Sequence, residues 1–290
     1  MSKTENALTV KYNREYLVVQ ANELVRSKQD DLSLLEAKLV RLAISQVLEN
    51  DTDFRTYSCN ITDLAKFLGL SKDNIYRDVQ DLAESIMKKS IYIKDKQVNK
   101  NGKPNYKIYH WVSSVEYRDG QITFKLSEDL KPFLIGLEEL FTMYSYEALI
   151  DLPTNNSIRL YELLASWQIS TLRSTPKTNY TSIPIEKNEF IFTIGYLREY
   201  FNCTDKYPNT GDFIINVIDR SVKAIQKNTL MKVTYRKVKN GRSIEHIVFK
   251  LNDLGEPSPE WKEKMKKIKN LMIDLNSELP NSDLPFPSRL

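Results

Sequence analysis

Four residues near the C-terminal end of the chain combine side-chain types and a spacing that suit nucleic-acid recognition. Asn216, Arg220, Lys223 and Lys227 fall on one face when successive helical positions are placed about 100° apart. Asn and Arg can form paired hydrogen bonds with adenine and guanine edges, and Lys can contact a base or a phosphate. The spacing therefore predicts a helix with one face that reads DNA.

The opposite face of the same predicted helix is aliphatic, and a basic hairpin follows it. The aliphatic residues, which we expect to be buried, are Ile214, Ile218, Val222 and Ile225. Strand-like residues 230–236 then lead to a turn at Lys239-Asn240-Gly241-Arg242. A helix that packs by one face and precedes a cationic hairpin is typical of a winged-helix domain.

Positive charge is concentrated in this part of the chain. The whole sequence of 290 residues has a net charge of only +4, whereas residues 205–250 carry +6. A local field of this kind favours a polyanionic partner such as double-stranded DNA. A lysine-rich surface also serves solubility, so the charge alone leaves both interpretations open.

The predicted elements of the first half follow the order helix, helix-turn-helix, hairpin. Ser33 begins an amphipathic helix, residues 60–63 cap a short helix that ends at Gly69, and a longer helix covers residues 75–89. Strand-like runs separated by Asn-Gly and Asp-Gly turns come next, at residues 90–94, 106–115 and 121–126. This order predicts a helix-turn-helix followed by wings.

The second half repeats that order with different residues. Residues 157–164 form an amphipathic helix, residues 190–192 a short strand, and Thr193 caps the next helix. Leu64 and Leu197 are counterparts 133 positions apart, and the offset grows to 139 beyond the longer second turn. Amphipathic helices resemble one another easily, so the shared order carries the prediction. It indicates an α+β protein of two tandem winged-helix domains related by internal duplication.

The candidate DNA-contacting residues lie on and beside the two predicted recognition helices. Those of the second unit are Asn209, Thr210, Asn216, Arg220, Lys223, Lys227, Arg236, Lys237, Lys239 and Arg242. Those of the first unit are Ser71, Lys72, Asn74 and Arg77. The outward face of the first helix also holds Asp81 and Glu84, so we expect the C-terminal domain to be the dominant reader.

Composition and the positions of Pro and Gly residues predict five segments along the chain. A short apolar stretch begins at residue 16, and Pro132 and Gly136 limit regular structure in a later apolar segment. The final segment is lysine-rich and then proline-rich. The predicted segments are an N-terminal arm (1–31), a first winged helix (32–130), a connection (131–145), a second winged helix (146–252), and a basic helix with a disordered tail (253–290).

Several other classes of protein leave no trace in the sequence. No apolar run is long enough to cross a bilayer, and the start lacks the order of a secretion signal, so we expect a cytoplasmic protein.

Cys59 and Cys203 are predicted to be buried core thiols without a disulfide. His110 and His246 are isolated and suit half-buried structural positions. With no phosphate-binding loop or nickase-like histidine pair, we expect no cofactor, no metal ion and no catalysis.

Two motifs resemble those of the iteron-binding plasmid replication initiators, the Rep family, over about residues 8–251. The first is Ser157-Ile158-Arg159-Leu160-Tyr161-Glu162-Leu163-Leu164, similar to the family's S-x-R-L-Y-E-L-L helix. The second is the run from Asp212-Phe213 through Val217-Ile218 to Gln226. Many relatives have consecutive basic residues after this Phe, whereas this chain has Ile214-Ile215-Asn216, so the resemblance carries over the role of the helix but not those contacts.

The resemblance implies an origin-binding protein without enzymatic activity. A monomer would bind each direct repeat with both winged helices and promote opening of an AT-rich segment, leaving unwinding to a host helicase. A homodimer joined through the N-terminal domain would repress its own promoter. Two alternatives remain open, a transcriptional regulator of the same architecture and, in another class, a DNA nickase or recombinase.

Overall fold

The fold was taken from a computed structural model that describes residues 8–9, 17–48, 51–68, 75–98, 100, 104–138, 140–171, 183–186 and 188–251. Gly69, the turn after it, and the tail predicted over residues 253–290 lie outside these ranges. Residues 1–252 form one compact unit. No helix within the described ranges is long and apolar enough to span a membrane.

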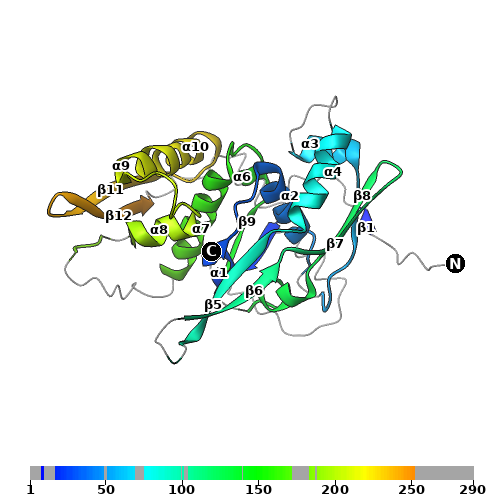
Figure 1. Cartoon of the computed structure of the whole chain (residues 1–290), viewed down its shortest axis with the longest axis horizontal. Helices are drawn as coiled ribbons and strands as arrows, with labels where there is room; N and C mark the ends of the chain where they lie inside the picture. The colour runs from blue at the N-terminus through cyan, green and yellow to red at the C-terminus, as the bar shows by residue number, and fades with distance from the viewer. Residues whose placement is uncertain are drawn as a thin grey trace. The chain divides into compact units, whose positions relative to one another are not determined.

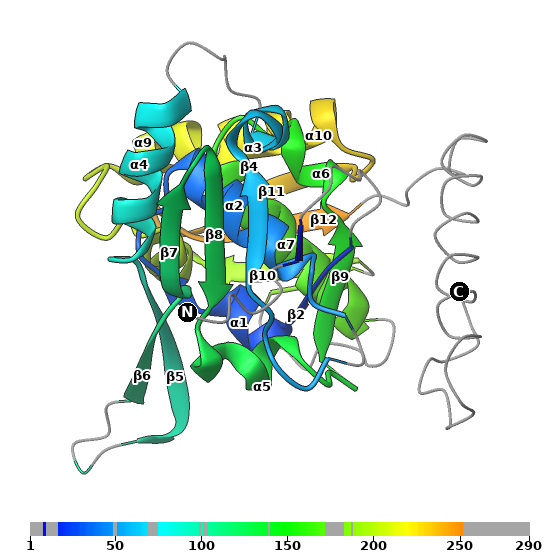
Figure 2. The same ribbon diagram turned by 90° about the vertical axis from the view of Figure 1, so that its right-hand side faces the viewer.

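The first winged helix is built on a four-stranded sheet with three helices beside it (Figures 1 and 2). The strand order is β1 (Leu8–Thr9), β4 (Tyr57–Asn60), β8 (Gln121–Leu126) and β7 (Val112–Arg118). The helices are α2 (Leu34–Ile44), α3 (Ile61–Leu68) and α4 (Ile75–Ile86). Helix α2 begins where the sequence predicted, because Ser33 and Glu36 form a capping box between their side chains and backbone amides.

The strand predicted over residues 106–115 is wrong as a single element. It divides at Trp111 into β6 (Pro104–His110), which pairs with β5 (Ser90–Val98), and β7, which pairs with β8. Trp111 is fully buried, so the chain bends there to place the indole in the core and leaves one sheet for another. Strands β5 and β6 join β3 (Lys28–Gln29) in a sheet of their own, and only β7 and β8 form the wing.

The segment before the second winged helix is more regular than its Pro and Gly residues suggested. Helix α5 (Lys131–Leu134) carries Pro132 in its first turn, where the missing N–H costs nothing. Strand β9 (Phe141–Ser145) pairs antiparallel with β2 (Leu17–Ala21). Two short helices adjoin this pair, α1 (Asn22–Arg26) after β2 and α6 (Glu147–Ile150) after β9. Residues of the predicted arm and of the predicted connection therefore form one small sheet.

The second winged helix has three helical segments and a three-stranded antiparallel sheet. Its helices are α7 (Asn155–Thr171), α8 (Ile194–Tyr200) and a long one composed of α9 (Thr210–Phe213), the π-helical turn η2 (Ile214–Asp219) and α10 (Arg220–Asn228). Its strands, in sheet order, are β10 (Glu189–Thr193), β12 (Ser243–Leu251) and β11 (Val233–Asn240). As predicted, the Thr193 hydroxyl caps α8 by accepting a hydrogen bond from the Tyr196 amide.

The two units share a sheet topology as well as an order of elements. In each, the strand before the helix-turn-helix pairs antiparallel with the last strand, which also pairs with the strand before it. The orders β4-β8-β7 and β10-β12-β11 are therefore equivalent. Strand β1 and the β5–β6 hairpin are additions found in the first unit.

Candidate nucleic-acid interface

The predicted recognition helix of the second unit is one continuous element with a π-helical turn in its middle. Its buried residues recur every four positions, at Phe213, Val217, Ser221 and Ile225. In a straight α-helix of 3.6 residues per turn, a row with this spacing drifts by about 40° at each step. The π turn contains more residues per turn and corrects the drift. One face therefore stays on the core along the whole helix.

The outward face of this helix presents the predicted cations. Arg220, Lys223 and Lys227 are all exposed, while the predicted aliphatic row opposite them is buried. Asn216 is half-buried, and its Nδ2 atom donates to the backbone carbonyl of Asp212 at 2.9 Å. The fully exposed part of the predicted recognition face therefore begins at Arg220, one turn after Asn216.

The start of the helix carries polar residues that the sequence analysis assigned to DNA contact. Asn209 precedes the first helical residue, is exposed, and donates from Nδ2 to the Asp212 carboxylate at 3.2 Å. Thr210 is half-buried. Asp212 is favourably placed for the helix dipole but adds a negative charge where phosphates would approach. The exposed cations of this helix therefore lie in its later turns.

The wing divides the predicted basic residues into two kinds. Lys237, Lys239 and Arg242 are exposed. Arg236 is also exposed, but it reaches across the sheet, where its Nη2 atom lies 3.0 Å from Glu189 Oε2 and 2.8 Å from the Pro184 carbonyl oxygen. This hydrogen bond from Arg236 lowers the pKa of the nearly buried Glu189. Arg236 thus ties β11 to β10.

We predict that Arg236→Ala lowers stability more than DNA affinity. Removing the guanidinium leaves a buried carboxylate without its strongest donor, which costs about 1 kcal/mol or more in the free energy of unfolding. Urea denaturation and a DNA titration at several salt concentrations measure the two effects. Lys237→Ala is the matched control, because it should leave the urea midpoint unchanged and weaken binding. Equal binding losses with no change in the midpoint for either variant would contradict the assignment.

Helix and wing are joined by two hydrogen bonds that the sequence did not predict. The Tyr235 hydroxyl on β11 donates to Asp219 Oδ1 at 2.6 Å, and Gln226 Nε2 donates to the Val233 carbonyl at 2.6 Å. Burial, together with the nearby carboxylate of Asp219, raises the pKa of Tyr235 above its ordinary value. Two side-chain hydrogen bonds therefore tie the recognition helix to the strand of the wing. A pairing across 16 residues gives no local signal that would have revealed it.

The recognition helix of the first unit, α4, presents a mixed surface. Arg77 is exposed, and its guanidinium lies 3.7 Å from the carboxylate of its neighbour Asp78. Asp81 and Glu84 are exposed on the same helix. The other predicted contacts of this unit, Ser71, Lys72 and Asn74, lie outside the described residues. Helix α4 of the first winged helix and α10 of the second lie toward the top in both views, and the β5–β6 hairpin lies toward the bottom (Figures 1 and 2).

The cysteines and histidines named in the sequence analysis lie outside the two recognition helices. Burial raises the pKa of Cys59 to about 12, and both Cys59 and Cys203 are buried free thiols, as predicted. His110 is exposed, not half-buried, and its Nδ1 lies 3.3 Å from the Lys89 carbonyl. Among the residues that the structure places, no three His, Cys, Asp or Glu side chains are grouped to hold a metal.

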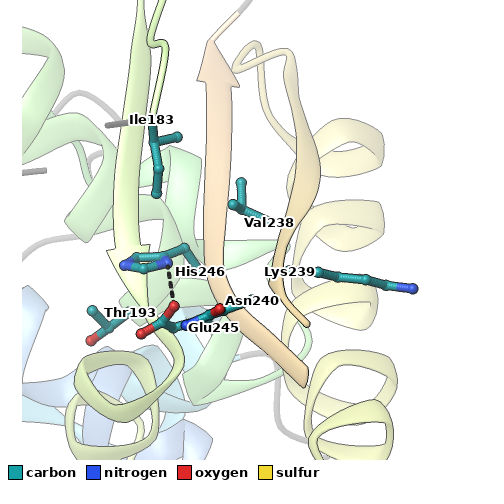
Figure 3. Close-up of a pocket in the computed structure, with 7 residues that line it drawn as sticks. All are labelled: Ile183, Thr193, Val238, Lys239, Asn240, Glu245 and His246. Atoms are coloured by element: carbon teal, nitrogen blue, oxygen red, sulfur yellow. Dashed lines mark ion pairs between the residues drawn. The ribbon is translucent and has the colours of Figure 1, made fainter. Parts of the chain in front are cut away.

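The second histidine lies at the base of the second wing, beside a cavity of about 450 Å³ (Figure 3). His246 is buried, deeper than predicted, and its Nδ1 lies 3.9 Å from the carboxylate of Glu245. The lining residues come from the ends of the three strands and from the segment before them. They are Ile183, Thr193, Val238, Lys239, Asn240, Glu245 and His246.

Comparison with protein families decides the relationship that the two motifs suggested. The family model described as "Initiator Replication protein, WH1" matches residues 17–165, and the one described as "Initiator Rep protein, WH2" matches residues 193–251. The chain belongs to the initiator replication protein family. Its members are plasmid replication proteins with winged-helix, DNA-binding domains. The family is not a typical enzyme family. The predicted family and the predicted α+β fold of two winged helices are therefore confirmed.

One solved structure with a related description is the WH1 domain of MSBI1.176, a replication protein isolated from a multiple sclerosis patient. The match covers 35% of this initiator and 79% of that chain, with 17% sequence identity and a TM-score of 0.27.

Proposed function

We propose that this initiator binds direct repeats in double-stranded DNA at a plasmid origin, with α4 and α10 in successive major grooves. The observation that supports this most strongly is the pair of equivalent winged helices whose recognition helices lie toward one side. The second adds an exposed cationic stripe at Arg220, Lys223 and Lys227 and a basic wing. Such a surface suits the phosphates and base edges of a duplex.

Opening of an adjacent AT-rich segment would follow from binding, without nucleotide hydrolysis. Phosphate neutralisation and DNA bending supply the free energy in this scheme, and a host helicase extends the open region. The Ser71–Lys72–Asn74–Arg77 group, Asn209, Thr210, Asn216 and the basic residues of the second unit remain the proposed contact set. Arg236 is the member for which the structure favours a structural role instead.

A homodimer through the N-terminal domain, acting as a repressor of its own promoter, is the second part of the proposal. Strand β6 is an edge strand of its sheet and leaves one side of its backbone without a neighbouring strand among the described elements. Tyr106 and Ile108 on this strand are exposed. An open edge with exposed apolar side chains favours pairing with another chain. The monomer would be the form that binds repeats.

The proposal is tested with duplexes that carry the repeats flanking the gene. Fluorescence anisotropy at low salt should show binding at least about 10³-fold tighter to repeats than to scrambled duplexes, the usual margin for specific recognition. Equal affinity for both would contradict the proposal. A plasmid carrying the gene and its repeats should replicate in a suitable host. Tight repeat binding without replication would favour the transcriptional regulator.

An enzyme of the nickase or recombinase class makes a different prediction. Supercoiled origin DNA incubated with the protein and Mg²⁺ should remain unbroken. A strand break that disappears when one tyrosine is replaced by phenylalanine would show covalent chemistry and overturn the binding-only scheme.

A further inference from the structure

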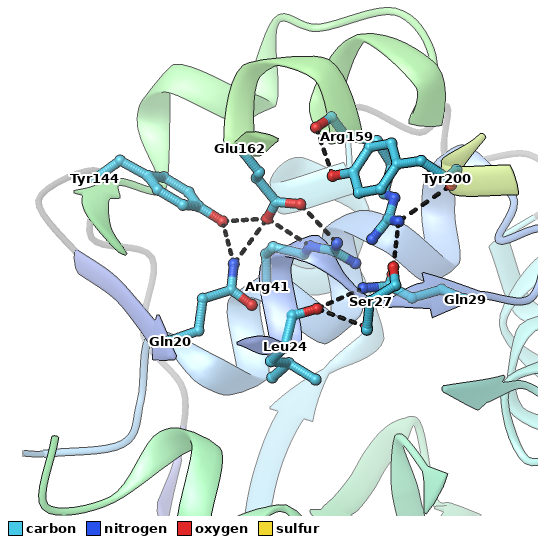
Figure 4. A network of polar contacts seen from close by, with 9 residues as sticks. All are labelled: Gln20, Leu24, Ser27, Gln29, Arg41, Tyr144, Arg159, Glu162 and Tyr200. Carbon is cyan, nitrogen blue, oxygen red and sulfur yellow. Dashed lines mark hydrogen bonds and ion pairs between the residues drawn. The ribbon is translucent and has the colours of Figure 1, made fainter. Parts of the chain in front are cut away.

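A buried ion pair joins the two halves of the initiator (Figure 4). Arg41 on α2 and Glu162 on α7 have fully buried side chains, with Nε to Oε1 at 3.0 Å and Nη2 to Oε2 at 2.8 Å. The Tyr144 hydroxyl and Gln20 Nε2 also donate to Glu162 Oε1, the latter at 3.0 Å. Two parallel hydrogen bonds between a planar guanidinium and a carboxylate fix orientation as well as distance.

Each member of the pair favours the charged form of the other despite their burial. Burial alone would raise the pKa of Glu162, but the charge and hydrogen bonds of Arg41 lower it below the ordinary value. Burial likewise opposes the charge on Arg41, whereas Glu162 raises its pKa. The Arg41 guanidinium also lies 5.4 Å from the ring centre of Trp111. Each charge therefore depends on the other staying in place.

A second buried arginine holds the same helix, close to Glu162. Arg159, one turn before Glu162 on α7, donates from Nη2 to the carbonyls of Ser27 at 2.8 Å and Tyr200 at 3.2 Å. Its guanidinium lies 3.9 Å from the centre of the Tyr200 ring, and the Tyr200 hydroxyl donates to the Arg159 carbonyl at 2.9 Å. Helix α7 is therefore held by directional bonds toward both units.

These contacts lie on the path between the two recognition helices. In the first unit α4 packs against α2, which carries Arg41. In the second, α10 packs along α7, which carries Glu162. Apolar burial has no preferred direction, whereas a bidentate ion pair is lost when the helices rotate. The pair is thus the orienting contact between α2 and α7.

We infer that the Arg41–Glu162 pair fixes the separation and angle of α4 and α10, and thereby selects the spacing between the two groove contacts in a DNA site. The inference rests on the proposed function, in which both helices bind one duplex. One base pair changes the separation of two groove contacts by about 3.4 Å and their rotation by about 35°. Arg41 and Glu162 are positioning residues, because neither reaches the DNA surface.

Two variants separate the geometry of the pair from the stability of the fold. Arg41→Met with Glu162→Gln removes both charges, and the Gln side chain can still accept from Tyr144. Arg41→Lys keeps the charge but loses the paired hydrogen bonds. The control is Asp31→Asn, which removes an exposed ion pair to Lys206 with a separation of 2.8 Å between the same two units.

The first measurement needs no DNA. Spin labels are attached at Gln80→Cys on α4 and Lys223→Cys on α10, both exposed positions, while buried Cys59 and Cys203 stay unlabelled. Pulsed electron paramagnetic resonance should give one narrow distance distribution for the parent and for Asp31→Asn. The two pair variants should give distributions that are broader or shifted by about 3.4 Å, the rise of one base pair. Folded variants with the parent distribution would overturn the inference.

The second measurement uses duplexes selected from random DNA by the parent protein. Base pairs are then inserted or deleted, one or two at a time, between the two footprints. Parent affinity should fall about tenfold per base pair, whereas the pair variants should vary by less than about threefold across the series. An unchanged spacing profile in both variants would overturn the inference. Failure of the parent to select any duplex would instead contradict the proposed function, and the distance measurement would still decide the role of the pair.

Discussion

Replacing Glu162 alone by leucine is expected to lower the free energy of unfolding by about 3–5 kcal/mol, a large share of the stability of most domains. The substitution leaves the fully buried Arg41 guanidinium without its carboxylate. It also removes the acceptor of the hydrogen bonds from Tyr144 and Gln20. Urea denaturation followed by circular dichroism measures the change through the midpoint at constant slope.

The same reasoning predicts that a second substitution restores stability. In Arg41→Met with Glu162→Leu no charge remains buried, and replacing a buried ion pair by apolar side chains is often neutral or stabilising. An exposed ion pair, Lys250 with Glu186, is the control, and Lys250→Ala should change stability by less than about 0.5 kcal/mol. A loss below about 1 kcal/mol for Glu162→Leu, or a double variant as unstable as the single one, would contradict the prediction.

The pH dependence has a defined sign. The pKa of Glu162 is lower in the folded state than its ordinary value, because the Arg41 interactions outweigh burial. Its ionised form therefore stabilises the fold above the unfolded-state pKa of about 4.3, and this contribution is lost as the pH falls through the folded-state pKa. The stability of the parent should accordingly fall more steeply in acid than that of the Arg41→Met, Glu162→Leu variant.

Local patterns carried most of the fold. The Ser33 capping box, the Thr193 cap and the aliphatic row of the second recognition helix each depend on residues within a few positions of one another. Such features are legible in a sequence because the interacting residues lie within one or two helical turns. The repeated order of elements then indicated the two winged helices.

Features that depend on distant partners could not be predicted. The chain bends at Trp111 because the indole is buried in the core, and the strands before and after this residue belong to two different sheets. Strand β2 finds its partner β9 more than 120 residues later, and Arg236 is tied to Glu189 across 47 residues. The π turn η2 could not be predicted either, because the aliphatic row Ile214, Ile218, Val222 and Ile225 fits the period of an ordinary α-helix.

The family motif shows the same difference between local features and features that depend on distant partners. Arg159 and Glu162 were recognised as part of a familiar helix, yet their roles became clear only from partners far away in the sequence. Both side chains are buried and hold the two units together. A charged residue in a DNA-binding protein therefore need not be a DNA contact, and burial separates the two roles.

Replacing Arg220 by alanine is expected to reduce affinity for the specific duplex by about 1–3 kcal/mol, which is roughly 5-fold to 150-fold. Arg220 is the first exposed cation after the π turn, on a helix whose buried face is fixed by core packing. Arg77→Ala should cost less, because Asp78, Asp81 and Glu84 already offset positive charge on α4.

The comparison distinguishes recognition from simple loss of charge. Arg55→Ala is the charge-matched control, because Arg55 lies in the first unit and pairs with Asp51 at 2.7 Å. Titrations with specific and scrambled duplexes at several salt concentrations separate the two effects, since a base contact changes the ratio of affinities and a phosphate contact changes the salt slope by about 1. Arg220→Ala should lower the ratio, and Arg55→Ala should leave both quantities unchanged. Equal losses for Arg220→Ala and Arg77→Ala would contradict the dominance of the second winged helix, because the two helices would then contribute equally to recognition.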